Sequence, residues 1–190
     1  MKSNKSQSAD LWKQIKRRTV LSTPFISVWE DVVELPNGHV IEDYSLVGLG
    51  DGVLIVATDE NERLITFREY KYAANKMLLG FPGGGIDGDE SPVEAAAREL
   101  LEETGYESTD IEYIAPLYVY PSKIVHINHV VRAKNARLTR KPQHELTESI
   151  GDIELIPLGE VAEMQKRGEF NATYLLAALA LTLPEYLNRP

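Results

Sequence analysis

The chain has 190 residues, of which 43% are hydrophobic, so it is long and apolar enough for one domain with a packed core and is not a disordered chain. Its formal net charge of −9 argues against a general affinity for nucleic acid or for an anionic membrane, although bound cations would still let it take a phosphorylated small substrate. The chain contains no cysteine, which excludes disulfides, thiolate metal sites and cysteine nucleophiles.

The first third of the chain predicts four strands. The first ten residues are polar and lack the apolar core of a signal peptide, so we expect a cytoplasmic protein. Alternating side chains predict a strand over residues 25–34 and a return strand from about 39 to 47. Asn37 and Gly38 between them are typical of a hairpin turn, because this pair adopts positive φ easily. Apolar runs predict further strands over residues 52–58 and 63–70.

A glycine-rich loop over residues 80–88 and one well-delimited helix follow. Ser91, Pro92 and Glu94 form a capping-box pattern with proline at the first helical position, and Gly105 is placed to close a helix over residues 92–104. Strands are predicted over residues 111–120, 125–133 and 153–157, and helices over 159–167 and 171–183. The fold class is therefore α+β, without the regular alternation of a doubly wound sheet. The apolar run over residues 174–183 is too short to span a bilayer.

The helix over residues 92–104 gathers three carboxylates. At 100° per residue, Glu102 and Glu103 fall within about 60° of Glu99, and Ala95 and Ala96 lie beside them. The larger apolar residues fall on the other side and are expected to pack on the sheet: Val93, Ala97, Leu100 and Leu101. Like charges this close destabilise a helix by a few tenths of a kcal/mol per pair. A hard cation such as Mg²⁺ or Mn²⁺ would cancel that cost; the alternative is a solvated acidic face without a ligand.

The glycine run before the helix strengthens the metal hypothesis. Residues 81–85, Phe-Pro-Gly-Gly-Gly, allow the backbone to approach a ligand closely because three of them have no Cβ. Their carbonyl groups are available as oxygen ligands beside the carboxylates. A flexible turn without any ligand is the alternative.

Loop and helix together carry nine residues with fixed spacing: Gly84, Glu90, Arg98, Glu99, Leu100, Glu102, Glu103, Gly105 and Tyr106. This set resembles the Nudix box, G-x5-E-x7-R-E-U-x-E-E-x-G-U, in which U is apolar, and every fixed position is present. The resemblance implies an α/β/α sandwich around a mixed sheet, with a Nudix domain over residues 48–190. Residues 1–47 would form an N-terminal tail and β-hairpin extension that serves dimerisation. The implied activity is hydrolysis of a nucleoside diphosphate linked to another group.

The same resemblance assigns roles to individual residues. It implies that Glu99, Glu102 and Glu103 face the metal ions and that the carbonyl of Gly83 is a further ligand. Arg98 would orient the glutamates through charge-assisted pairs, and Glu90 would tie the loop to the helix. For Arg98 the alternative is an ordinary surface salt bridge.

Two features outside the box resemble the ADP-ribose pyrophosphatase group of the family. Pro121 follows Gly105 by sixteen residues, as a proline does in that group, and residues 67–72 resemble the strand that precedes the box there. Lys71 stands where the group has a substrate-binding arginine. The implied substrate is a nucleoside diphosphate sugar, with ADP-ribose the leading example. The implied assembly is a homodimer whose N-terminal strands reach the neighbour's active site.

Four side chains are expected to contact this substrate. Arg68 and Lys71 would hold phosphate oxygens, with charges at a strand edge as the alternative. Phe25 and Trp29 would stack on the base, with burial in the core as the alternative.

The chain also departs from the group at two positions. Gly80 stands where the group has a glutamate before the loop, and the group's catalytic glutamate of a later loop aligns near Gly151. Glu148 is the nearest carboxylate upstream, so we expect it to be the general base, with a solvated loop residue as the alternative. Two other functions stay open: a Nudix hydrolase of dinucleoside polyphosphates or nucleoside triphosphates, and a non-catalytic nucleotide sensor.

Overall fold

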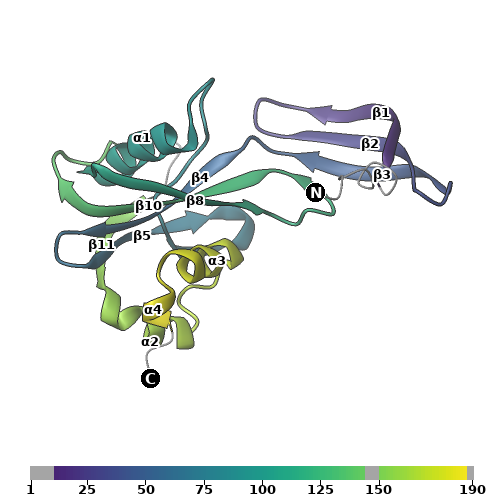
Figure 1. The fold of residues 1–190 in the computed structure, drawn as a ribbon. Helices are drawn as coiled ribbons and strands as arrows, with labels where there is room; N and C mark the ends of the chain where they lie inside the picture. The colour runs from purple at the N-terminus through teal and green to yellow at the C-terminus, as the bar shows by residue number, and fades with distance from the viewer. Residues whose placement is uncertain (1–10, 144–149, 188–190) are drawn as a thin grey trace, which may run out of the picture. The chain divides into compact units, whose positions relative to one another are not determined.

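The computed structural model describes residues 11–143 and 150–187, and the chain divides into two compact units (Figure 1). Unit 1 consists of Met1–Gly50 and Tyr118–His126, and unit 2 consists of Asp51–Leu117 and Ile127–Pro190. A segment from the middle of the chain therefore belongs to the same unit as the N-terminal strands.

Unit 1 is a four-stranded sheet in the order β1-β2-β3-β9. Its strands are β1 (Lys13–Ser22), β2 (Ser27–Glu34), β3 (Val40–Gly48) and β9 (Ile124–Val125). The neighbours β1–β2 and β2–β3 are antiparallel, whereas β3 and β9 are parallel. The predicted hairpin is confirmed as β2–β3. Only Gly38 in its turn has positive φ, at 82°, and its amide donates to the carbonyl of Leu35 at 2.9 Å.

The sequence does not predict β1. All ten of its residues are exposed, so no alternation marks a buried face. The strand is stabilised by its ladder to β2 and by Arg17, whose Nε and Nη2 each donate to Asp31 at 2.8 Å. The guanidinium of Arg17 also lies over the ring of Trp29, with its Cζ 4.5 Å from the ring centroid.

Unit 2 is built on a mixed sheet in the order β11-β5-β4-β10-β7, with β6 paired to β5 and β8 paired to β10. The central β4–β10 pair is parallel, and β5 is antiparallel to β4, β6 and β11. The predicted strand over residues 125–133 is divided between β9 and β10. The strands are β4 (Gly52–Asp59), β5 (Arg63–Lys71), β6 (Lys76–Gly80), β7 (Tyr106–Glu107), β8 (Asp110–Tyr118), β10 (Ile127–Leu138) and β11 (Ile150–Pro157).

Helices cover both faces of this sheet (Figure 1). On one face α1 (Pro92–Thr104) packs on a core that includes Ile55, Ile65 and Val131. On the other face α3 (Thr173–Thr182) packs on a core that includes Val56 and Leu64 and is continued by α2 (Val161–Lys166) and α4 (Pro184–Leu187). Alternate residues of β4 and β5 thus serve opposite cores. The predicted α/β/α sandwich around a mixed sheet is confirmed.

The C-terminal helices begin and end differently from the prediction. The helix expected over residues 159–167 is preceded by a 3-10 turn, η2 (Leu158–Glu160), so α2 starts at Val161. The helix expected over residues 171–183 is divided into α3 and α4 at Leu183, whose φ of −135° is not helical because a proline follows it. Within residues 11–143 and 150–187, no helix has the length and apolar character needed to cross a membrane.

Candidate active site

Helix α1 begins and ends at the residues that the sequence predicts. The hydroxyl of Ser91 accepts from the amide of Glu94 at 3.3 Å, and the carboxylate of Glu94 accepts from the amide of Ser91 at 2.8 Å. Gly105 closes the helix in the left-handed conformation, with φ 75°, and donates to the carbonyl of Leu101 at 2.9 Å. Both ends of the helix that carries the carboxylates are therefore fixed by local hydrogen bonds.

The glycine-rich loop is inserted between two strands of the sheet. β4 and β5 pair only at Thr58 and Leu64, beyond which the loop takes the place of β5 beside β4. The carbonyl of Pro82 accepts from Ile55 at 2.8 Å, and that of Gly84 accepts from Val53 at 2.9 Å. The loop is thus held by backbone hydrogen bonds and is not the flexible turn considered as an alternative.

Glycine is required in this loop because other groups approach the backbone closely. A Cβ on Gly83 would lie 2.2 Å from the carbonyl oxygen of Val53. A Cβ on Gly84 would lie 2.3 Å from Oε1 of Glu99, so this carboxylate rests directly against the loop. The amide of Gly83 donates to Oε2 of Glu103 at 2.7 Å. Two of the three helix carboxylates therefore meet the backbone of the loop.

The face of α1 that packs on the sheet differs from the predicted one. The fully buried residues of the helix are Ala95, Ala96, Leu100, Glu103 and Thr104. The small alanines, expected beside the acidic face, are the ones that face the core, and they let the helix approach closely enough for Glu103 to reach Gly83. Glu103 is only 6% exposed, in contrast to the solvated acidic face considered as an alternative.

Arg98 connects the loop to the carboxylates. Its Nε and Nη2 donate to the two carboxylate oxygens of Glu90 at 3.0 and 2.9 Å, and Nη2 also donates to the carbonyl of Gly85 at 2.9 Å. Its Nη1 donates to Glu99 at 2.8 Å and to Glu102 at 3.3 Å. The hydrogen bonds to Glu90 raise the pKa of Arg98 and lower the pKa of Glu90, so both groups stay charged. Arg98 is more than an isolated surface salt bridge.

The chemistry of this cluster fits a divalent cation. The guanidinium of Arg98 lies within 4 Å of four carboxylates, those of Asp87, Glu90, Glu99 and Glu102. With Glu103, which is held by the amide of Gly83, the five carboxylates and one guanidinium leave four net negative charges. Oxygen ligands of this kind suit Mg²⁺ and Mn²⁺. In the described part of the chain, no three such groups converge on a single point, and Arg98 holds two of the carboxylates.

Two family models match this chain over adjacent segments. The model described as NUDIX domain matches residues 48–179, which include the loop and α1. The chain belongs to the Nudix family. The model described as nucleoside diphosphate sugar hydrolase N-terminal domain matches residues 12–47.

Individual relatives with similar sequences or structures include hydrolases of ADP-ribose and other ADP compounds. The ADP-ribose pyrophosphatase of Bacillus subtilis is 24% identical over 92% of this chain and 95% of its own length. The CMP-5'-(N-acetyl-N-hydroxy-3-aminopropyl)phosphonate hydrolase of Streptomyces rubellomurinus is 29% identical over 90% of this chain and 83% of its own length. A crystal structure described as ADP compounds hydrolase superposes with a TM-score of 0.80 at 26% identity, covering 96% and 97% of the two chains. The predicted likeness to the ADP-ribose pyrophosphatase group is confirmed.

The two basic residues expected to bind phosphate lie on opposite faces of the Nudix sheet. Arg68 and Glu154 lie on the α3 side, where Nε of Arg68 donates to Glu154 at 2.9 Å and Nη2 lies 3.6 Å from Glu169. Lys71 is three residues further along β5 and therefore faces the α1 side, where its Nζ pairs with Glu69 at 2.5 Å. Glu69 was not among the residues predicted to form the site, although the Glu-x-Lys spacing on a strand places both side chains on one face.

The remaining predicted substrate residues belong to unit 1. Phe25 is 86% exposed, which excludes burial in the core. The ring of Trp29 is half-buried and packs against Gly48, where a Cβ would lie 2.1 Å from the ring. Pro121 is exposed in the turn after β8. Their contacts with substrate stay a prediction, as does the role of Glu148, which lies outside the described residues.

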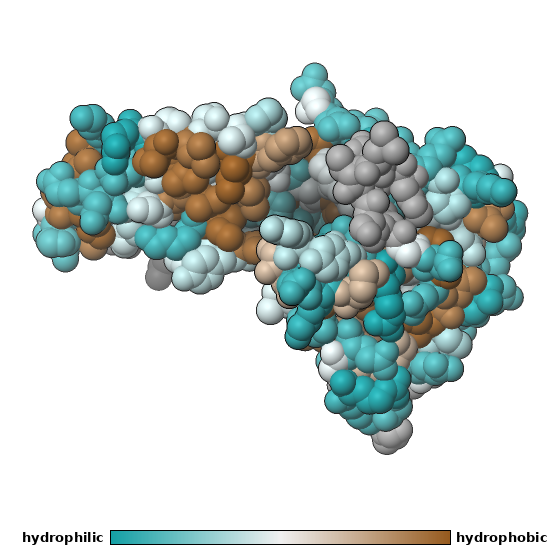
Figure 2. All heavy atoms as spheres, turned by 180° about the vertical axis from the view of Figure 1, so that it is seen from behind, coloured by the Kyte–Doolittle hydropathy of each residue, from teal (hydrophilic) through white to brown (hydrophobic). Residues whose placement is uncertain are grey.

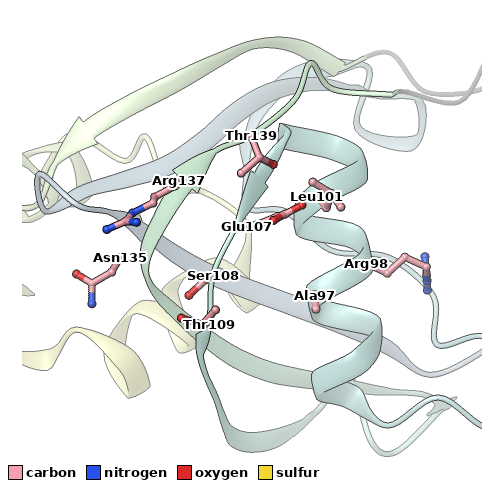
Figure 3. A pocket seen from close by; sticks show the side chains of 9 residues that line it. All are labelled: Ala97, Arg98, Leu101, Glu107, Ser108, Thr109, Asn135, Arg137 and Thr139. Carbon is pink, nitrogen blue, oxygen red and sulfur yellow. The ribbon is translucent and has the colours of Figure 1, made fainter.

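A pocket of about 600 Å³ opens on the other flank of α1. Figure 3 shows Ala97 and Leu101 of the helix on one side of it and Thr139 and Arg137 of the strand side on the other, while Arg98 directs its guanidinium away from them. Arg98 lines this pocket and also binds the carboxylates, so the pocket borders the carboxylate cluster along α1.

Proposed function

We propose that this protein hydrolyses the diphosphate bond of ADP-ribose or a related nucleoside diphosphate sugar, using Mg²⁺ or Mn²⁺ bound by Glu99, Glu102, Glu103 and the carbonyl of Gly83. The observation that carries the proposal is the contact of Glu99 and Glu103 with the backbone of the glycine-rich loop. The named activities of the Bacillus subtilis relative and of the superposed structure support the choice of substrate.

Each residue of the cluster has a part in the proposed reaction. When bound, the cation supplies Lewis acidity and lowers the pKa of a bound water. Glu99 and Glu103 hold it in a fixed place because the loop backbone restrains both carboxylates. Arg98 orients the carboxylates, and Lys71 supplies a positive charge for a phosphate oxygen. Glu148 is proposed to remove the proton of the attacking water. The products would be a nucleoside monophosphate and a sugar phosphate.

A second substrate class is favoured by one observation. The Streptomyces rubellomurinus relative is described as a hydrolase of a CMP-linked phosphonate and matches 90% of this chain. A nucleotide linked to a phosphonate, in place of a sugar phosphate, would present a similar anionic bridge to the same carboxylates. The site is therefore to be tested with both classes, together with dinucleoside polyphosphates and nucleoside triphosphates.

A substrate panel with Mg²⁺ or Mn²⁺ tests the proposal. We expect ADP-ribose to give AMP and ribose phosphate, and Glu103→Gln to lower kcat by about 100-fold or more, because it removes a charged cation ligand. Glu107→Gln, in β7 on the lining of the pocket beside α1, is the matched control and should keep full activity. Failure to cleave any nucleotide of the panel would refute the proposal and favour a nucleotide sensor. Full activity of Glu103→Gln would refute the metal assignment.

We also propose that the protein is a cytoplasmic homodimer that pairs through unit 1. Figure 2 shows apolar side chains gathered on an exposed face of this unit, and β1 exposes Ile15, Val20 and Leu21 to about half of their area or more. Exposed apolar patches of this kind favour association. Fractionation of cells would test the location.

A further inference from the structure

β5 presents two different faces to the two sides of the sheet. Leu64 packs in the core beneath α3, whereas Ile65 packs in the core beneath α1. Between Phe67 and Lys71 the pairing of β5 with β6 runs without a register shift, so the alternation continues to the end of the strand. Glu69 and Lys71 therefore lie on the same side of the sheet as α1.

These two residues form a close ion pair on that side. Nζ of Lys71 lies 2.5 Å from Oε2 of Glu69, and the Glu69 side chain is 20% exposed against 45% for Lys71. The carboxylate is thus the more firmly enclosed partner. A lysine on its own has a long side chain with many rotamers, so a fixed carboxylate restricts where its ammonium group lies.

The many negative charges near the pair make the ammonium group of Lys71 important for binding an anionic substrate. The carboxylate cluster of the loop and α1 has four net negative charges, and its one guanidinium, Arg98, is occupied by Asp87, Glu90, Glu99 and Glu102. The positive charge of Arg68 lies on the opposite face with Glu154. Arg63, at the other end of β5, is held by Asp59, so Lys71 is the cation that this end of β5 presents to an anionic substrate on the α1 side.

We propose that Glu69 is a positioning residue for the hydrolysis reaction. It holds the ammonium group of Lys71 on the α1 side of β5, where that group contacts a phosphoryl oxygen of the substrate. This inference rests on the proposed function, since it takes the diphosphate to bind beside α1.

The direction in which KM changes when Glu69 is neutralised separates a positioning role from simple charge repulsion. If Glu69 acts only as one more negative charge near a polyanionic substrate, its neutralisation lowers KM, because repulsion is removed. If Glu69 positions Lys71, neutralisation raises KM, because the ammonium is no longer held in place.

The test is steady-state kinetics of ADP-ribose hydrolysis with Mg²⁺. We expect Glu69→Gln to raise KM about tenfold while kcat changes less than about twofold, as for the loss of a hydrogen bond to a charged group. In a Lys71→Gln background the same change should have no further effect, because the group that Glu69 positions is already gone. Lys71→Arg, which keeps a cation, should retain KM within about threefold. An unchanged or lower KM for Glu69→Gln, or additive effects in the double variant, would overturn the proposal.

A matched control and a binding measurement complete the design. Glu112→Gln breaks a glutamate–arginine pair of the same length, 2.5 Å to Arg132 on the neighbouring strand, and should leave KM unchanged. Calorimetric binding of pyrophosphate with Mg²⁺ gives a readout that needs no turnover. If the wild type cleaves no nucleotide, the proposed function fails. About tenfold weaker pyrophosphate binding by Glu69→Gln would then still support the positioning of Lys71, and equal binding would overturn it.

Discussion

At the scale of residues, Arg17 on strand β1 and Arg98 on helix α1 bind a carboxylate with the same geometry. Each donates from Nε and Nη2 to both oxygens of one carboxylate, Asp31 for Arg17 and Glu90 for Arg98. In both cases the hydrogen bonds from arginine lower the pKa of the carboxyl group. Arg98 differs in that its Nη1 also donates to Glu99 and Glu102, which joins it to the proposed metal ligands.

The lowered pKa of Asp31 predicts an acid-dependent stability of unit 1. A carboxyl group whose pKa is lower in the folded state stabilises that state above its ordinary pKa of about 3.9 and loses this contribution as the pH falls through the lowered value. At pH 7 we expect Asp31→Asn to lower the urea midpoint by roughly 0.5 M, and the difference from wild type to shrink as the pH falls below the ordinary pKa of Asp and through the lowered pKa of Asp31. Both tryptophans of the chain, Trp12 and Trp29, lie in unit 1, so their fluorescence reports this unit.

Glu30→Gln is the comparison for this measurement. It breaks a more exposed pair with Arg18, for which we expect a small difference at every pH. A difference between Asp31→Asn and wild type that persists unchanged at low pH would contradict the assignment.

At the scale of elements, the site depends on the glycine-rich loop lying directly beneath α1. Gly84→Ala would place a methyl group 2.3 Å from the carboxylate of Glu99 and push it away from its place. We expect this variant to bind Mn²⁺ at least about tenfold more weakly in a calorimetric titration, as when a ligand's supporting contacts are lost. A Cβ on Gly85 would have no atom within 4 Å, so Gly85→Ala should lose far less affinity for Mn²⁺. Equal losses in the two variants would contradict the proposed role of the loop.

The elements differ in how far the sequence predicts them. The bounds of α1 follow from signals that act locally, namely Ser91, Pro92 and Gly105, and the Nudix box identifies its carboxylates. β1 and the short β6 have no such signal: β1 has no buried residue, and the position of β6 depends on its pairing with β5. The rotation of α1 onto Ala95 and Ala96 is also not local, because it depends on the loop that Glu103 must reach.

At the scale of the whole molecule, the open face of unit 1 predicts self-association. We expect light scattering to give twice the chain mass of 21.3 kDa for the wild type. Replacing two exposed apolar residues of β1, Ile15→Glu with Leu21→Glu, should give the monomer, because buried unpaired charges are costly at an interface. Leu138→Glu, at a more exposed apolar position in unit 2, is the control. A monomeric wild type, or a double variant that stays dimeric, would contradict the proposed dimer.

The predicted domain boundary at residue 47 stays a prediction. Unit 1 differs from the predicted N-terminal extension because it contains a second, later segment of the chain. Residues 118–126 belong to the same compact unit as the N-terminal strands, because β9 pairs with the end of β3. The two family models meet between residues 47 and 48. That boundary is a division of the linear sequence, whereas unit 1 also includes residues 118–126.

This pairing of β9 with β3 has a consequence for how the chain is made on the ribosome. When the first three strands have been synthesised, the last strand of their sheet has not, because it follows α1 and most of the strands that the helix covers. While the Nudix box is being translated, the edge of β3 that pairs with β9 in the folded protein therefore has no partner strand. Unit 1 therefore cannot be completed before residues 51–117 of unit 2 have been synthesised, and the nascent chain is most prone to mispairing in that interval.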